Sequence, residues 1–125
     1  MSSSHVFLLK RVYDPAAPQD GKRFLVDRLW PRGMRKEKLL IDGWLKDVAP
    51  SPALRTWFDH KAENFSEFSA RYREELAQHP AACEPLLQAI ESGNVTLLYA
   101  AKDPDINHAV VLRDYLQKKR RAARR

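Results

Sequence analysis

The hydrophobic residues of the chain follow two kinds of spacing, and the first kind predicts three β-strands. Residues 6–13 begin with an apolar run and end in alternation, and residues 23–30 alternate more regularly. Residues 95–101 read VTLLYAA, a continuous apolar run that is typical of a fully buried strand. A connector rich in Pro, Asp and Ala joins the first two strands, and its length leaves their relative direction open.

The second kind of spacing is helical and occupies the segment between the second and third strands. Leu40, Ile41, Trp44, Leu45 and Val48 recur at this spacing and predict a helix over residues 36–47. Further helices are expected after Ser51-Pro52, over residues 66–78, from Pro80 to Ser92-Gly93, and after Asn107 as an N-cap.

This order of elements predicts an α/β fold with a small, mainly parallel sheet of about three strands. Because a strand that is apolar throughout must be covered on both sides, we expect helices on both faces, as in a Rossmann-like layered domain. A length of 125 residues favours one domain, assigned to residues 1–117 and followed by a basic C-terminal tail at residues 118–125.

The net charge of +6 lies in the tail. Residues 118–125, KKRRAARR, contain six cations, so the rest of the chain is neutral overall. Within that neutral part, residues 22–38 carry seven cations and two anions. The tail fits a solvated helix end, and weak, non-specific binding of nucleic acid through the tail and residues 22–38 is the alternative.

Other compositional features exclude several classes of protein. Cys83 is the single cysteine, which rules out an internal disulfide and predicts a buried, inert thiol. No apolar run approaches the roughly 20 residues of a membrane span, and no secretory signal is visible, so a cytoplasmic protein is expected. Glycine-rich cofactor loops and metal-ligand spacings are absent from the sequence, so neither a cofactor nor a metal is predicted.

Four stretches of the sequence carry a resemblance to a known family. VYDP, DGKRFLVDRLWPRG, LRTWF and TLLYAAKDPDINHAVVL resemble the YeaO-like family of small bacterial proteins, over about residues 6–117. The resemblance implies a compact α/β domain with a small, largely parallel sheet, in the cytoplasm, and it supplies no established reaction. Relatives in the wider class have a cysteine near the end of the last strand and a Cys-His-Arg start to the last helix. Here Tyr99 and Asn107-His108-Ala109 stand at those positions, so only the histidine matches.

Two predicted loops converge if the second and third strands are parallel, because ligands bind at the carboxyl ends of such strands. One loop is Trp30–Gly33, WPRG, which fits a type I turn, and the other precedes the last helix. Arginine forks and a helix N-terminus suit a phosphate or carboxylate. We therefore expect a crevice for a small anionic ligand, with Arg28, Arg32, Lys102 and Asn107 as binding residues. Alternatively, Arg28 pairs with a carboxylate and only holds the loops together.

A catalytic role is a separate hypothesis. His108, in the first turn of the last helix, could act with Asp103 as an acid/base pair, and His60 could reach the same crevice. The alternative is a helix-start histidine that bonds to backbone or to Asp103. A third interpretation of the whole chain is an interaction protein without catalysis.

Overall fold

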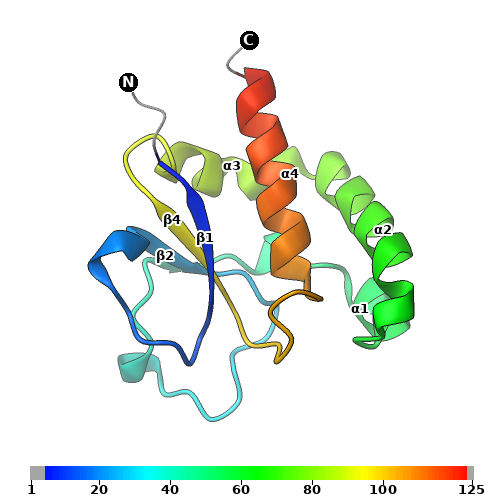
Figure 1. The fold of residues 1–125 in the computed structure, drawn as a ribbon, viewed down its shortest axis with the longest axis horizontal. Coiled ribbons are helices and arrows are strands. Elements are labelled where there is room, and N and C mark those ends of the chain that lie inside the picture. The colour runs from blue at the N-terminus through cyan, green and yellow to red at the C-terminus, as the bar shows by residue number, and fades with distance from the viewer. Residues whose placement is uncertain (1–4, 124–125) are drawn as a thin grey trace.

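The computed structural model of the chain describes residues 5–123, which form a mixed α/β fold around one parallel sheet (Figure 1). The sheet has four strands in the order β1-β4-β2-β3. Their bounds are β1 Phe7–Arg11, β2 Lys22–Leu25, β3 Gly43–Trp44 and β4 Val95–Tyr99. The predicted fold class is confirmed, and the three predicted strands are β1, β2 and β4.

β1 and β2 both pair in parallel with β4, which settles the direction that the sequence left open. The register places Leu9 and Phe24 on either side of Leu97. The connection from β1 to β2 therefore passes β4, and a single 3-10 turn at Pro18–Asp20 makes the crossing. All five residues of β4 are buried, as expected for the central strand of a small sheet.

The predicted helix over residues 36–47 is wrong. The structure has a 3-10 turn at Lys36–Lys38, the two-residue strand β3 and a second 3-10 turn at Lys46–Val48. β3 pairs with Phe24 and Leu25, and the Leu45 amide donates to the Leu25 carbonyl at 2.8 Å. Pairing at the sheet edge is favoured over a helix because it provides hydrogen-bond partners for the backbone of residues 43–45 and packs Trp44 against the sheet. Gly43 also disfavours a helix.

The four α-helices of the described residues lie on one face of the sheet (Figure 1). They are α1 Pro52–Phe58, α2 Phe65–Gln78, α3 Pro80–Ala89 and α4 His108–Ala123, close to the four helices predicted after Val48. Side chains from all four pack with Phe24 and Leu97 in the main hydrophobic core.

The opposite face of the sheet is covered by the segment that joins β2 to β3, so helices on both faces were wrongly expected. Leu25 and Leu98 point to this side and pack against Leu39, with Trp30 and Trp44 at the edge of the cluster. The two tryptophan rings meet edge to face at 5.3 Å between centroids. Irregular chain, instead of a helix, thus buries the second face.

α4 continues into the segment predicted as a basic tail. Residues 118–123 belong to this helix, and Arg120 donates from Nη1 to the His5 carbonyl at 2.8 Å. Residues 124 and 125 of the predicted tail lie outside the described residues. Among residues 5–123, every helix is too short or too polar to cross a membrane.

Candidate functional site

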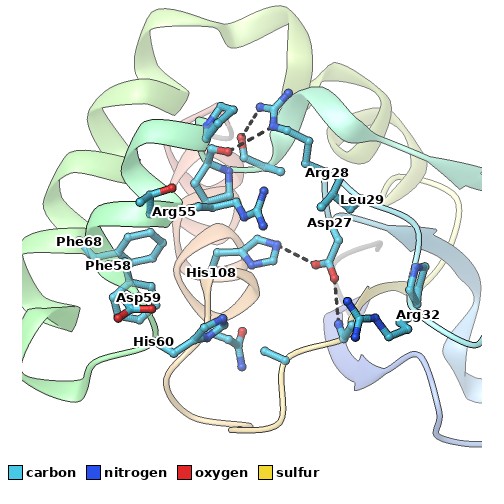
Figure 2. A pocket seen from close by; sticks show the side chains of 18 of the residues that line it. Asp27, Arg28, Leu29, Arg32, Arg55, Phe58, Asp59, His60, Phe68 and His108 are labelled. Carbon is cyan, nitrogen blue, oxygen red and sulfur yellow. Dashed lines mark hydrogen bonds and ion pairs between the residues drawn. The ribbon is translucent and has the colours of Figure 1, made fainter.

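A pocket of about 590 Å³ opens at the carboxyl edge of the sheet, between the segment after β2, helix α1 and the start of α4 (Figure 2). This is the edge at which parallel α/β sheets bind their ligands. The ionisable side chains of its lining include three arginines, two aspartates and two histidines: Arg28, Arg32, Arg55, Asp27, Asp59, His60 and His108.

His108 and Asp27 form a close pair at the floor of the pocket. His108 Nε2 lies 3.1 Å from Asp27 Oδ1 and 3.0 Å from the Val26 carbonyl oxygen. Because that carbonyl can only accept a hydrogen bond, Nε2 carries a proton and donates. Asp27 Oδ2 accepts from the Ala100 amide at 3.0 Å, so the carboxylate also links the end of β4 to the segment after β2.

Arg28 holds two segments together through backbone carbonyls. Its Nε and Nη2 donate to Pro50 and Ala49, at 3.4 Å and 3.2 Å, and in Figure 2 the guanidinium turns toward these carbonyls, away from His108. This geometry fits the alternative that Arg28 holds loops together better than it fits a ligand-binding role. The partners of Arg28 are backbone carbonyls, however, and not the carboxylate that the alternative assumed. Arg28 fixes the position of the chain just before α1.

Arg32 and Arg55 are the two arginines of the pocket that are not engaged in this way. Both are exposed, and within residues 5–123 no carboxylate lies within ion-pair distance of either guanidinium. In the view of Figure 2, the Arg55 guanidinium appears above His108, and Arg32 lies on the other side of Asp27 from His108. The pocket therefore presents two positive groups on either side of the imidazole.

The turn that carries Arg32 differs by one residue from the predicted type I turn. The Met34 amide donates to the Pro31 carbonyl at 3.3 Å, so the turn spans residues 31–34. Gly33 stands at its third position with a φ of +78°, which type II turns require and which glycine adopts without strain. Arg32 is therefore the second residue of the turn, and its side chain lines the pocket.

Helix α1 and the turn after it supply the opposite wall. Ser51 caps α1 by accepting from the Leu54 amide at 3.2 Å, and Glu75 of α2 anchors Ser51 through its amide and hydroxyl, at 2.9 Å and 2.6 Å. This anchoring sets the direction in which Arg55 projects. After α1, Asp59 and His60 have φ values of 49° and 55°, a left-handed backbone that aspartate and histidine tolerate better than most residues. The reversal brings His60 to the pocket.

The structure separates the other residues predicted for the site. Lys102 and Asp103 are exposed and do not line the pocket. Asp103 Oδ1 accepts from the Asp105 and Ile106 amides, at 2.8 Å and 3.1 Å, so this carboxylate closes its own loop. The residue beside His108 is Asp27, and the predicted pairing of His108 with Asp103 is therefore corrected to a pairing with Asp27.

Asn107 lines the pocket but has a structural task there. Its Oδ1 accepts from the Val110 amide at 3.1 Å, the N-cap interaction predicted for it, and its Nδ2 donates to the Asp103 carbonyl at 2.8 Å. With both polar atoms engaged, Asn107 orients the start of α4 and so places His108.

The sequence reasoning missed Asp27 and Arg55. Asp27 was hidden because the strand was extended to residue 30, whereas β2 ends at Leu25. An Asp-Arg pair at the end of an apolar strand is the signal that could have found it. Arg55 lies one turn into the helix that Ser51-Pro52 predicts, but nothing in the sequence shows that this helix faces the last loop.

Residues 5–123 contain no cluster of three or more His, Cys, Asp or Glu side chains that could hold a metal ion. Tyr99, at the end of β4, is buried in the main core, and burial raises its pKa. Cys83 is also buried, and burial raises the pKa of its thiol to about 11, which leaves it protonated and inert at neutral pH.

Comparison with known proteins confirms the relationship indicated by the sequence motifs. Residues 6–124 match a family model, DUF488-N3i, described as the inactive DUF488-N3 subclade. The chain is 46% identical to the uncharacterized protein YeaO of Escherichia coli K12 over 108 residues, which cover 86% of this chain and 94% of that protein. It is 44% identical to the uncharacterized proteins Mb3100c of Mycobacterium bovis and Rv3073c of Mycobacterium tuberculosis, over 85% of this chain and 89% of theirs. No solved structure gives a significant match.

Proposed function

Because this chain belongs to the DUF488-N3i family, the inactive DUF488-N3 subclade, we propose that its pocket binds a small phosphorylated or carboxylated molecule without converting it. The observation that carries the proposal is the pair Arg32 and Arg55, two guanidiniums at the pocket with no carboxylate partner in the described part of the chain. An anionic group between them would receive charge-assisted hydrogen bonds from both guanidiniums, which would also offset the charge of the neighbouring Asp27 carboxylate.

The start of α4 supports an anion at the same place. His108 is the first residue of this 16-residue helix, and the amino end of a helix carries a partial positive charge. Because Nε2 donates to Val26, Nδ1 of the neutral ring can only accept a hydrogen bond, so the helix end and the two arginines supply the donors for an anion. Asp27 pairs with Nε2 and keeps the ring in place. The site is thus arranged to hold an anion against the helix end.

The absence of a nucleophile argues for binding without catalysis. Relatives in the wider class have a cysteine near the end of the last strand, where this chain has the buried Tyr99. The thiol of Cys83 belongs to α3, is buried, and does not line the pocket. Asp27 and His108 form a pair that could orient a base, but no activated hydroxyl or thiol is hydrogen-bonded to it among residues 5–123.

A titration with inorganic phosphate tests this proposal. We expect calorimetry to give saturable binding to the wild type, and an affinity at least about tenfold lower for Arg55→Ala and for Arg32→Ala, since a hydrogen bond to a charged group contributes about 1.5–3 kcal/mol. Both residues are exposed, so neither change should unfold the protein. Arg73→Ala, an exposed arginine of α2 outside the pocket, is the matched control and should bind as the wild type does. Equal affinity in all four proteins would refute the pocket as the anion site.

The second candidate is weak binding of nucleic acid. Lys118, Lys119 and Arg121 are exposed on the last turns of α4, and residues 32–38 add further exposed cations. The helical end is a surface that can contact a phosphate backbone without reading sequence. It stands second because charged helix ends are ordinary features of soluble helices.

A further inference from the structure

We propose that the ligand of this pocket is an amphipathic anion, an aryl phosphate or aryl carboxylate, whose ring packs against Leu29 while its anionic group binds Arg32 and Arg55. This inference rests on the proposed function, because it names the chemical class of the ligand at the same site. Three observations carry it: the size of the pocket, the apolar part of its lining, and the exposure of Leu29.

The pocket is much larger than a free anion requires. Its volume of about 590 Å³ lies within the roughly 300–1,000 Å³ of sites for drug-sized molecules. A phosphate group between Arg32 and Arg55 would occupy only one part of it. The remaining space calls for a ligand with a body attached to the charged group.

Part of the lining around that space is apolar. Leu29, Pro31, Pro50, Pro52, Phe58 and Ala101 all contribute to it. In Figure 2, Leu29 and Phe58 lie on opposite sides of the pocket, with Arg55 and His108 between them. Phe58 is 5% exposed and stacks on Phe68, so only a small part of its ring is accessible to a ligand. Apolar walls with a few placed polar groups are the usual composition of a small-molecule site.

Leu29 is the large hydrophobic residue of this lining that is exposed to solvent. Its side chain is 62% exposed although it borders the pocket, whereas the neighbouring Trp30 packs on Trp44 and donates to the Met34 carbonyl. A flat ring seated beside Leu29 would remove apolar surface from water on both partners. A guanidinium also stacks on aromatic faces, so Arg55 can contact the ring as well as the anion.

The test compares phenyl phosphate with methyl phosphate, which share the anionic group and differ in the body. We expect the wild type to bind phenyl phosphate about tenfold more tightly by calorimetry. Leu29→Ser should remove most of this preference, because it should weaken the binding of phenyl phosphate far more than that of methyl phosphate. Leu40→Ser is the matched control, since Leu40 is also 62% exposed but lies outside the pocket, and it should behave as the wild type does.

The possible outcomes separate the two proposals. Equal binding of the two esters, with affinity still lost in Arg55→Ala, would overturn the aryl ligand and leave the anion site standing. A preference for phenyl phosphate that survives Leu29→Ser would also overturn the assignment of Leu29. Failure of both esters and of inorganic phosphate to bind would overturn the proposed function together with this inference.

Discussion

Replacing Asp20 with alanine is expected to lower the free energy of unfolding by about 3–5 kcal/mol, the usual cost of removing one partner from a buried ion pair. Asp20 is only 1% exposed and sits in the crossing between β1 and β2. Its carboxylate lies 2.9 Å from Lys10 Nζ, accepts from Arg23 Nη1, and accepts from the Ala17 amide at 3.1 Å. Its loss would leave the buried Arg23 without a counter-charge.

Urea unfolding at neutral pH measures this cost, and the exposed pair Arg35–Glu37 provides the control. Glu37→Ala removes a carboxylate from an ion pair whose side chains are 72% and 64% exposed, so its effect should stay within about 0.5 kcal/mol. Similar stabilities for Asp20→Ala and Glu37→Ala would contradict the role given to the buried carboxylate.

The stabilisation from Asp20 should also depend on pH. Burial raises the pKa of Asp20, but hydrogen bonds from Lys10, Ala17 and Arg23 outweigh it and hold the pKa below its ordinary value of 3.8. A carboxyl with a lowered pKa contributes stability that is fully present above the unfolded pKa and disappears as the pH falls through the folded one. The difference between the wild type and Asp20→Asn should therefore be constant from pH 7 to about 5 and shrink below 3.8.

Gly21→Val is expected to have a comparable effect, about 2–5 kcal/mol, through the backbone. Gly21 has a φ of +63°, and an added Cβ would stand 2.0 Å from the Asn94 carbonyl oxygen. Asn94 is unable to move aside freely, because its side chain accepts from the Val6 amide and donates to the Gln19 carbonyl, each at 2.9 Å. Left-handed strain and a backbone clash thus act together.

Gly93 offers the matched control for this change. Its φ lies outside the left-handed range, and no atom lies within 4 Å of an added Cβ. Gly93→Val should change the midpoint of thermal unfolding little, whereas Gly21→Val should lower it by many degrees. A Gly21→Val protein as stable as the wild type would show that the crossing before β2 is looser than described.

The fold was predictable for those segments whose local sequence pattern determines their secondary structure. The continuous apolar run of β4 predicts a strand and the amphipathic patterns of α2 and α3 predict helices, because these structures bury such patterns. Residues 36–47 have helical spacing too, but their environment is an exposed sheet edge, where pairing with β2 satisfies the backbone. The secondary structure of residues 36–47 depends on pairing with β2, which is distant in sequence, and the local spacing of apolar residues does not show this pairing.

The location of the site could be predicted from the sequence, but only some of its residues could. The parallel strands β2 and β4 bring the WPRG turn and the start of α4 to the carboxyl edge of the sheet, as the order of elements predicted. The partner of His108 was not predicted, because its identity depends on where β2 ends. In addition, polar side chains in short loops often accept hydrogen bonds from nearby backbone amides, as Asp103 does, and are then not available to a residue outside the loop. Arg55 required knowledge of how α1 packs on α2, a contact through Glu75 that spacing alone does not reveal.

The central claim, an anion site between Arg32 and Arg55 at the start of α4, is tested most directly by a nuclear magnetic resonance titration with inorganic phosphate. We expect saturable shifts of the side-chain Nε–H signals of Arg32 and Arg55 and of the His108 ring, with little change at Lys118, Lys119 and Arg121. Shifts confined to the end of α4, with Arg32 and Arg55 unaffected, would place the anion on the basic helix end and contradict the account.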